Sequence, residues 1–285
     1  MQFPTAAATT NTVTLDAVIA HLAARDVVEG LVQMGTTGTA ALTRTSDYDL
    51  LLILALPAAP VRMVTTRIDG RFTEVYCTTM HTLARIAADP ANWPEASAEG
   101  AIVRWLQAGR IVHDRAGRLA RARAAVVTLP PASPTERDVR AAWATIGYNL
   151  AVIERYMASD DPIAQEAVDW RLLYSLSELA THYFTVRRLP WRGEKAALRS
   201  LAREDPDFLD RFRRCLAETD RRRKVEHFAD LARRVLVPVG GPWRTGTVVA
   251  APGPGFGALA GSEPAGTDEA ALAFWQDLIG PISEE

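Results

Sequence analysis

The stretch that most constrains the fold is residues 34–56, where a loop rich in glycine and threonine separates two apolar segments. The second segment opens with Asp47 and Asp49 and continues as the apolar run 50–54. Side chains alternate along a strand, so the two carboxylates point the same way, and an unbroken apolar run is typical of a strand covered on both faces. Placing two carboxylates at the start of such a strand costs free energy unless a cation binds them. The sequence therefore predicts a site for a hard divalent cation, which prefers oxygen ligands.

The loop and the acid pair together resemble a known signature. The order Gly35-Thr36-Thr37, then Ser46-Asp47-Tyr48-Asp49 on the next strand, resembles the Gly-Ser and Asp-x-Asp motif of the nucleotidyltransferase superfamily. Thr36 replaces the usual serine and keeps a hydroxyl. The resemblance implies that Asp47 and Asp49 are metal ligands, and that the nucleotide is bound by Gly35, Thr36, Thr37 and Ser46. The loop lacks the lysine of a Walker loop and has no G-x-G-x-x-G, which excludes the P-loop and Rossmann alternatives.

A third carboxylate, Glu74, is expected in a β-hairpin. Residues 61–68 and 71–79 are rich in β-branched and aromatic side chains and flank Asp69-Gly70, a strong two-residue hairpin signal. The stretch 71–76 resembles the third-carboxylate strand of the aminoglycoside adenylyltransferases, and this implies that Glu74 is the general base. From the residues alone, Glu74 could equally be a metal ligand or a solvated acid on the wet face of a strand.

The second half of the chain has a different periodicity. A proline-rich linker at 129–134 precedes long stripes with helical spacing, one of which includes Ile163, Trp170 and Leu173 and is interpreted as core. We expect an α/β (α+β) chain: a nucleotidyltransferase-type mixed sheet flanked by helices over 1–128, then an all-α helical bundle over 135–285. Within the bundle domain, a Gly- and Pro-rich stretch at 239–266 should precede a last helix at 268–278.

Three residues of the helical half are further site candidates. The segment 171–198 resembles the second domain of aminoglycoside adenylyltransferases, which implies that Lys195 contacts the triphosphate. Asp169 and Glu178 lie on the preceding helix, where the resemblance implies binding of a cationic acceptor. For each of the three, a solvated side chain on a helix surface is the alternative.

Length, charge and cysteine content narrow the class of protein. A chain of 285 residues with a formal charge of −2 can bury a substantial core and is not a general polyanion binder. Its two cysteines are too few for a disulfide framework, which favours a reducing cytoplasm. The first residues do not resemble a signal peptide, and the longest apolar run contains Pro57 and Pro60, so we expect no membrane association.

These features predict a Mg²⁺-dependent nucleotidyltransferase. Two magnesium ions would stabilise the in-line attack of a hydroxyl on the α-phosphorus of a nucleoside triphosphate. ATP is the first candidate for this triphosphate, and in that case AMP is transferred. The expected acceptor is a small cationic molecule such as an aminoglycoside antibiotic, rather than tRNA. A toxin-type enzyme that modifies tRNA, and a catalytically silent nucleotide-binding or antitoxin-like module, are the alternatives.

Overall fold

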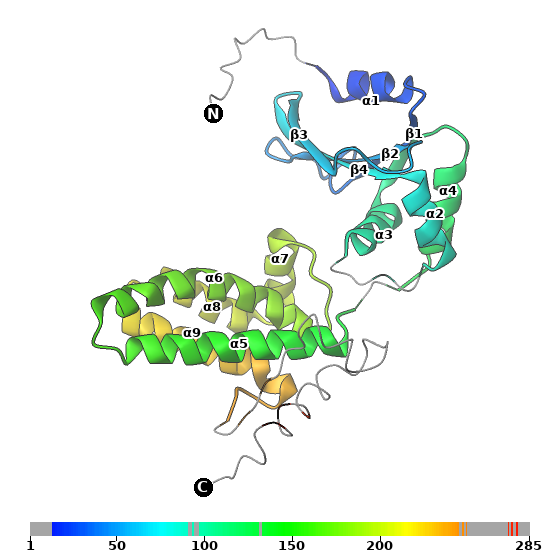
Figure 1. The fold of residues 1–285 in the computed structure, drawn as a ribbon. Helices are drawn as coiled ribbons and strands as arrows, with labels where there is room; N and C mark the ends of the chain where they lie inside the picture. Colours follow the sequence, from blue (N-terminus) through cyan, green and yellow to red (C-terminus); the bar gives the residue numbers. More distant parts are fainter. Residues whose placement is uncertain are drawn as a thin grey trace. The chain divides into compact units, whose positions relative to one another are not determined.

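The computed structural model of the chain describes residues 13–90, 93, 97–130 and 133–244, together with positions 247, 249, 273, 275 and 278. Contacts between Cα atoms divide the chain into two compact units, residues 1–133 and 134–285. Figure 1 shows a mixed α/β unit and an all-helical unit. Each is described by itself.

A five-stranded mixed sheet forms the first unit. The strands are β1 (Val28–Met34), β2 (Tyr48–Leu54), β3 (Met63–Ile68), β4 (Arg71–Thr79) and β5 (Arg110–Asp114), in the order β3-β4-β2-β1-β5. The neighbours β2 and β4 are parallel, and the other three pairs are antiparallel. The Asp69-Gly70 turn joins β3 to β4 as a hairpin, as the sequence predicts.

Helices cover both faces of this sheet (Figure 1). One face packs on α2 (Met80–Ala88), α3 (Ala98–Ala108) and α4 (Arg118–Val126), with Leu51 and Ile53 of β2 in that core. The other face packs on α1 (Leu15–Ala23), where Leu50 is fully buried. The apolar run of β2 is therefore covered on both sides, and only the opening end of the strand carries acids. This confirms the interpretation of residues 50–54.

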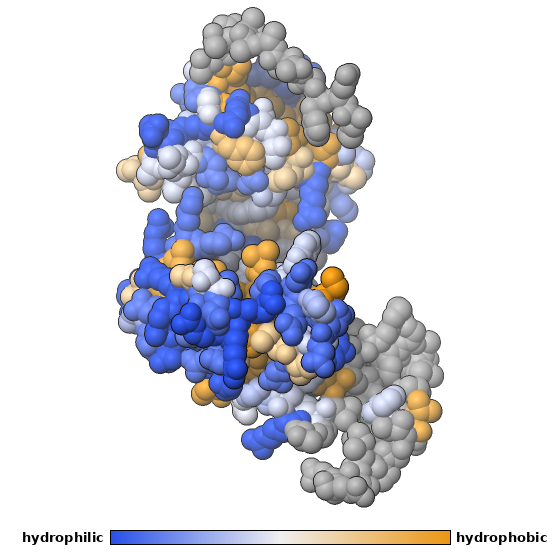
Figure 2. All heavy atoms as spheres, turned by 90° about the vertical axis from the view of Figure 1, so that its left-hand side faces the viewer, coloured by the Kyte–Doolittle hydropathy of each residue, from blue (hydrophilic) through white to orange (hydrophobic). Residues whose placement is uncertain are grey.

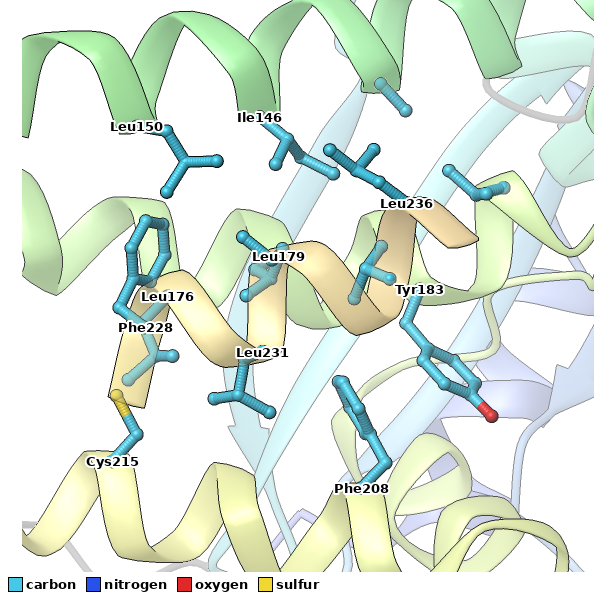
Figure 3. Close-up of a cluster of buried hydrophobic side chains, with 14 of the residues drawn as sticks. Ile146, Leu150, Leu176, Leu179, Tyr183, Phe208, Cys215, Phe228, Leu231 and Leu236 are labelled. Atoms are coloured by element: carbon cyan, nitrogen blue, oxygen red, sulfur yellow. The ribbon is translucent and has the colours of Figure 1, made fainter. Parts of the chain in front are cut away.

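The second unit is a helical bundle of α5 (Glu136–Met157), α6 (Pro162–Val186), α7 (Glu194–Glu204), α8 (Pro206–Ala217) and α9 (Arg221–Leu236), followed by the 3₁₀ turn η1 (Val237–Val239). Thr135 and Asp138 form a capping box that starts α5, and Asp161 caps α6 ahead of Pro162. Figure 3 shows apolar side chains from α5, α6, α8 and α9 meeting in one core around Leu179, Phe208 and Leu231.

One core prediction is wrong in part. Trp170 and Leu173 are both 80% exposed, and Ile163 is 70% exposed, so the first part of this stripe of α6 does not belong to the core. Leu176, Tyr183 and Val186, further along the same stripe, are buried as predicted. In the first part of α6 the buried residues include Val168 and Leu172, which lie on a different face of the helix. The helix carries apolar residues on more than one face, so periodicity alone could not select the buried one. Figure 2 shows isolated apolar patches among mostly polar residues on the surface of the helical unit.

The predicted fold class is confirmed: a mixed sheet flanked by helices precedes an all-helical region. The predicted domain limits, 1–128 and 135–285, concern independent folding and stay a prediction. Most of the stretch 239–266 and of the expected helix 268–278 lies outside the described residues, although positions 273, 275 and 278 are helical. In the part of the chain that the structure describes, no helix has the length and apolar character needed to cross a membrane.

Candidate active site

A row of side chains across the sheet brings Asp49 and Glu74 together. Asp49 pairs with Met34 on β1 and with Glu74 on β4, and Glu74 pairs in turn with Thr65 on β3. Residues paired on adjacent strands point to the same face, and neighbouring strands lie about 4.8 Å apart. Asp49 and Glu74 are therefore neighbours on the face that packs on α2, α3 and α4. The sequence predicted the shared parity, and the parallel pairing of β2 with β4 supplies the contact.

Tyr76 belongs to the same group, although no role was predicted for it. It lies two residues after Glu74 on β4, and its hydroxyl donates a hydrogen bond to Glu74 Oε2 at 3.4 Å. Its ring packs against Trp105 of α3 with centroids 4.5 Å apart. Burial, and then the negative charges of Glu74 and Asp49, raise the pKa of the Tyr76 hydroxyl. Tyr76 therefore stays protonated and can act as a donor to the Glu74 carboxylate. The only sequence signal for this role is that residues 74 and 76 lie on the same face of one strand. The contact of Tyr76 with Trp105 is long-range and leaves no local signal.

The loop between β1 and β2 fits closely around Asp49. Gly35 has a φ of +58°, and a Cβ at this position would lie 2.7 Å from Asp49 Oδ2. Both the left-handed backbone and the close approach of the carboxylate therefore require glycine. Thr37 is buried, and its hydroxyl accepts a hydrogen bond from the Asp49 backbone N–H at 2.8 Å. The loop thus holds the backbone of Asp49 in place through Thr37 and leaves room for its side chain at Gly35.

The two hydroxyls predicted to bind nucleotide at Thr37 and Ser46 have partners within the chain. Thr37 Oγ1 is committed to Asp49, and Ser46 Oγ accepts from the backbone N–H of Thr43 at 3.0 Å. Thr36 is half-buried, and its carbonyl accepts from the Thr39 hydroxyl at 2.8 Å. The side chain of Thr36 is thus the hydroxyl of this loop that best suits a phosphate. The role of Thr37 in the structure is to support the loop.

The predicted metal ligands do not form a three-carboxylate centre as the chain stands. Among the described residues, no group of three or more His, Cys, Asp and Glu side chains is placed to hold a metal ion. Asp49 and Glu74 are neighbours in register, and Asp47 immediately precedes β2 with the same parity as Asp49. Magnesium commonly binds one or two carboxylates together with water and substrate phosphates. Asp47, Asp49 and Glu74 supply oxygen donors of the kind that magnesium prefers, and the binding of two magnesium ions stays a prediction.

Of the three candidates in the helical unit, Asp169 and Glu178 lie on α6 and Lys195 lies on α7. Asp169 accepts hydrogen bonds from Arg221 at 2.8 and 3.1 Å, and Glu178 accepts from the Asn149 amide at 3.0 Å. Both acids thus have partners inside their own unit, and their role in binding an acceptor stays a prediction. Lys195 is exposed in the first turn of α7. Its contact with a triphosphate stays a prediction.

Comparisons with known proteins give little more. No family model matches the chain, and no curated protein sequence matches it. Among solved structures, the chain is similar to a nucleotidyltransferase-like protein from Exiguobacterium sibiricum. The TM-score is 0.42 at 16% sequence identity, over 78% of this chain and 72% of that chain.

Proposed function

We propose that the chain is a nucleotidyltransferase that moves a nucleoside monophosphate, AMP from ATP first among the candidates, to an acceptor hydroxyl. The observation that carries the proposal is the row formed by Asp49 and Glu74, with Gly35 turned against the Asp49 carboxylate. Carboxylates held side by side at the end of a strand supply oxygen donors of the kind that a magnesium ion shared with a triphosphate prefers.

The reaction requires the acceptor oxygen to form a bond to the α-phosphorus while the bond to the pyrophosphate oxygen breaks. Glu74 takes the proton from the acceptor hydroxyl, and Tyr76 orients Glu74 by donating to Oε2. A bound Mg²⁺, held by Asp49 and Asp47, would polarise the phosphate and offset the charge on the departing pyrophosphate. The backbone around Gly35 lies next to Asp49 and would face the phosphates together with the hydroxyl of Thr36.

The acceptor class is the less constrained part of the proposal. The expectation of a cationic acceptor such as an aminoglycoside rested on Asp169 and Glu178. Because Arg221 and Asn149 already engage these two acids, they no longer favour a cation. The second candidate function, transfer to tRNA, is supported by the three arginines that line a pocket together with Asp47.

Transfer of label tests the proposal. The protein is incubated with magnesium and each of the four α-labelled nucleoside triphosphates, alone and with an aminoglycoside panel, free nucleotides or total tRNA. We expect label on one acceptor class together with released pyrophosphate. Asp49→Asn should abolish both, whereas Asp26→Asn, a matched change at an exposed aspartate in the same unit, should retain them. Labelled product formed equally well by Asp49→Asn would contradict the proposed function.

A further inference from the structure

A shallow pocket of about 530 Å³ lies at the open end of the sheet in the first unit. Its walls are the loop that precedes β2 and the turn of the β3–β4 hairpin. Six of the residues that line it are charged or aromatic: Arg44, Asp47, Arg67, Asp69, Arg71 and Phe72.

The pocket lies at the end of the sheet next to the candidate active site, and Arg67 and Phe72 of its lining share the face of Glu74. Arg67 pairs with Phe72 in the hairpin, and Phe72 lies two residues before Glu74 on β4. Asp47 likewise lies two residues before Asp49. Two residues along a strand span about 7 Å, so Phe72 lies about 7 Å from Glu74 along β4, toward the end of the sheet where the strand begins. A ligand in the pocket can therefore reach these carboxylates with a group a few ångströms away.

The charge of this pocket is positive. It contains three arginines, and among the described residues none of their guanidinium groups forms an ion pair with a carboxylate. Arg71 donates to the backbone carbonyls of Thr43 and Ser46 and lies over the Tyr48 ring, while Arg67 donates to the Gly70 carbonyl at 3.3 Å.

Of the two acids in the pocket, one is already engaged. Asp69 accepts hydrogen bonds from the Leu15 backbone N–H at 2.9 Å and from the Tyr48 hydroxyl at 3.2 Å. The other acid, Asp47, is the proposed magnesium ligand. The arginines are thus left to recognise an anion, and guanidinium groups are well suited to phosphate.

An aromatic surface lies beside the arginines. Phe72 is 46% exposed on its strand, in the pair that it forms with Arg67. Proteins bind nucleotides by stacking the base on an aromatic ring and pairing the phosphate with positive charges. An exposed phenylalanine ring next to guanidinium groups provides both. A polycationic acceptor would instead meet three like charges.

We infer that this pocket binds a nucleoside phosphate carried by the acceptor, either as a free nucleotide or as part of a nucleic acid strand. Arg44 and Arg67 hold the phosphate, Phe72 stacks on the base, and the acceptor hydroxyl extends toward Glu74. The inference rests on the proposed function for the identification of this ligand as the acceptor. It replaces the cationic acceptor expected from the sequence with an anionic one.

The test is a binding titration with the donor site filled. The full chain is saturated with magnesium and a non-hydrolysable ATP analogue, and labelled AMP and a short labelled RNA with a 5′ phosphate are titrated in separate arms. Adenosine, inorganic phosphate and an aminoglycoside serve as competitors. We expect AMP or the RNA to bind, inorganic phosphate to compete weakly, and the aminoglycoside to have no effect. Binding of AMP identifies a free nucleotide as sufficient, and binding of the RNA alone identifies a polynucleotide.

Matched variants link the binding to the pocket. Arg44→Ala with Arg67→Ala should weaken probe binding at least about tenfold, since hydrogen bonds to charged groups are lost. Phe72→Ala should weaken it about tenfold through loss of base stacking. Arg121→Ala, at an exposed arginine on α4, should bind as the wild type does. The melting temperature of each variant without ligand shows that it is folded.

Unchanged probe binding in the pocket variants, or preferential binding of the aminoglycoside, would overturn the inference. Loss of magnesium–ATP binding in the arginine variant would also overturn it, because the pocket would then bind the donor nucleotide. Failure of the proposed function looks different. In that case the wild type ignores magnesium–ATP, while AMP or RNA still binds and still depends on Arg44, Arg67 and Phe72.

Discussion

Gly35 and Asp49 depend on each other, because the carboxylate occupies the space that a side chain at 35 would fill. Gly35→Ala should lower the free energy of unfolding by about 1–2 kcal/mol through left-handed backbone strain. It should also displace Asp49 and remove stabilisation by magnesium–ATP. Thermal melting with and without the ligand measures both effects.

Gly117→Ala provides the control for backbone strain. Gly117 also has a positive φ, +67°, but a Cβ there meets only the end of the Arg121 side chain at 3.6 Å. This variant should be destabilised to a similar extent and keep its response to magnesium–ATP. If the two alanine variants respond equally to the ligand, the fit of Gly35 to Asp49 has no functional role.

Glu74 has two candidate roles, base and metal ligand, which the Gln variant separates. If Glu74 is the base, Glu74→Gln should still bind magnesium and nucleotide, while turnover falls by roughly two to four orders of magnitude. If it only positions metal, the variant should need more magnesium and recover activity when it is supplied. Single-turnover label transfer over a magnesium series distinguishes the two. Unchanged turnover would show that another group takes the proton.

At the scale of elements, local patterns predict the strands well. The run 50–54 could be placed because an apolar segment opening on two acids has few alternatives, and Asp69-Gly70 predicted the hairpin. The hairpin was expected beside Asp49, but the parallel register that sets Glu74 opposite Asp49 is a long-range contact without a local signal. The exposed part of α6 could not be predicted either, because Trp170 belongs to an apolar stripe of which the bundle covers only the later part.

The contact of α5 with α6 contains polar groups that should make it sensitive to pH. His182 is partly buried, and its Nε2 has no hydrogen-bond partner among the described residues. Burial lowers the pKa of its imidazole, and the nearby Glu178 only partly opposes this. The unfolded chain therefore binds a proton more readily than the folded one, so this stabilisation is present above the unfolded pKa of about 6.5 and is lost as the pH falls from there through the lowered folded pKa.

Urea unfolding at pH 7.5 and 5.5 measures this dependence. The wild type should lose unfolding free energy through His182 over this range, and His182→Leu should flatten the slope. His227→Leu, the matched change at an exposed histidine of the same unit, reports the effect of removing a surface imidazole. A slope unchanged by His182→Leu would assign the pH dependence to other groups.

At the scale of the whole molecule, each unit has a hydrophobic core of its own. Residues 134–285 expressed alone should therefore fold cooperatively into a helical protein. Phe208 is fully buried in that core, so Phe208→Ala should lower the unfolding free energy of the fragment by about 3–5 kcal/mol. Circular dichroism during urea unfolding measures both. A fragment without a cooperative transition would show that the predicted domain at 135–285 needs the rest of the chain.

The central claim is that the Asp49 end of β2 binds a magnesium-bound nucleoside triphosphate, and the most direct measurement is the unfolding free energy of the full chain with and without this ligand. With magnesium–ATP at one hundred times its dissociation constant, the wild type should gain about 2.7 kcal/mol. Asp47→Asn combined with Asp49→Asn should abolish this gain, and Asp26→Asn should preserve it. A wild-type protein whose stability is indifferent to magnesium and to all four triphosphates would contradict the claim and favour the silent module.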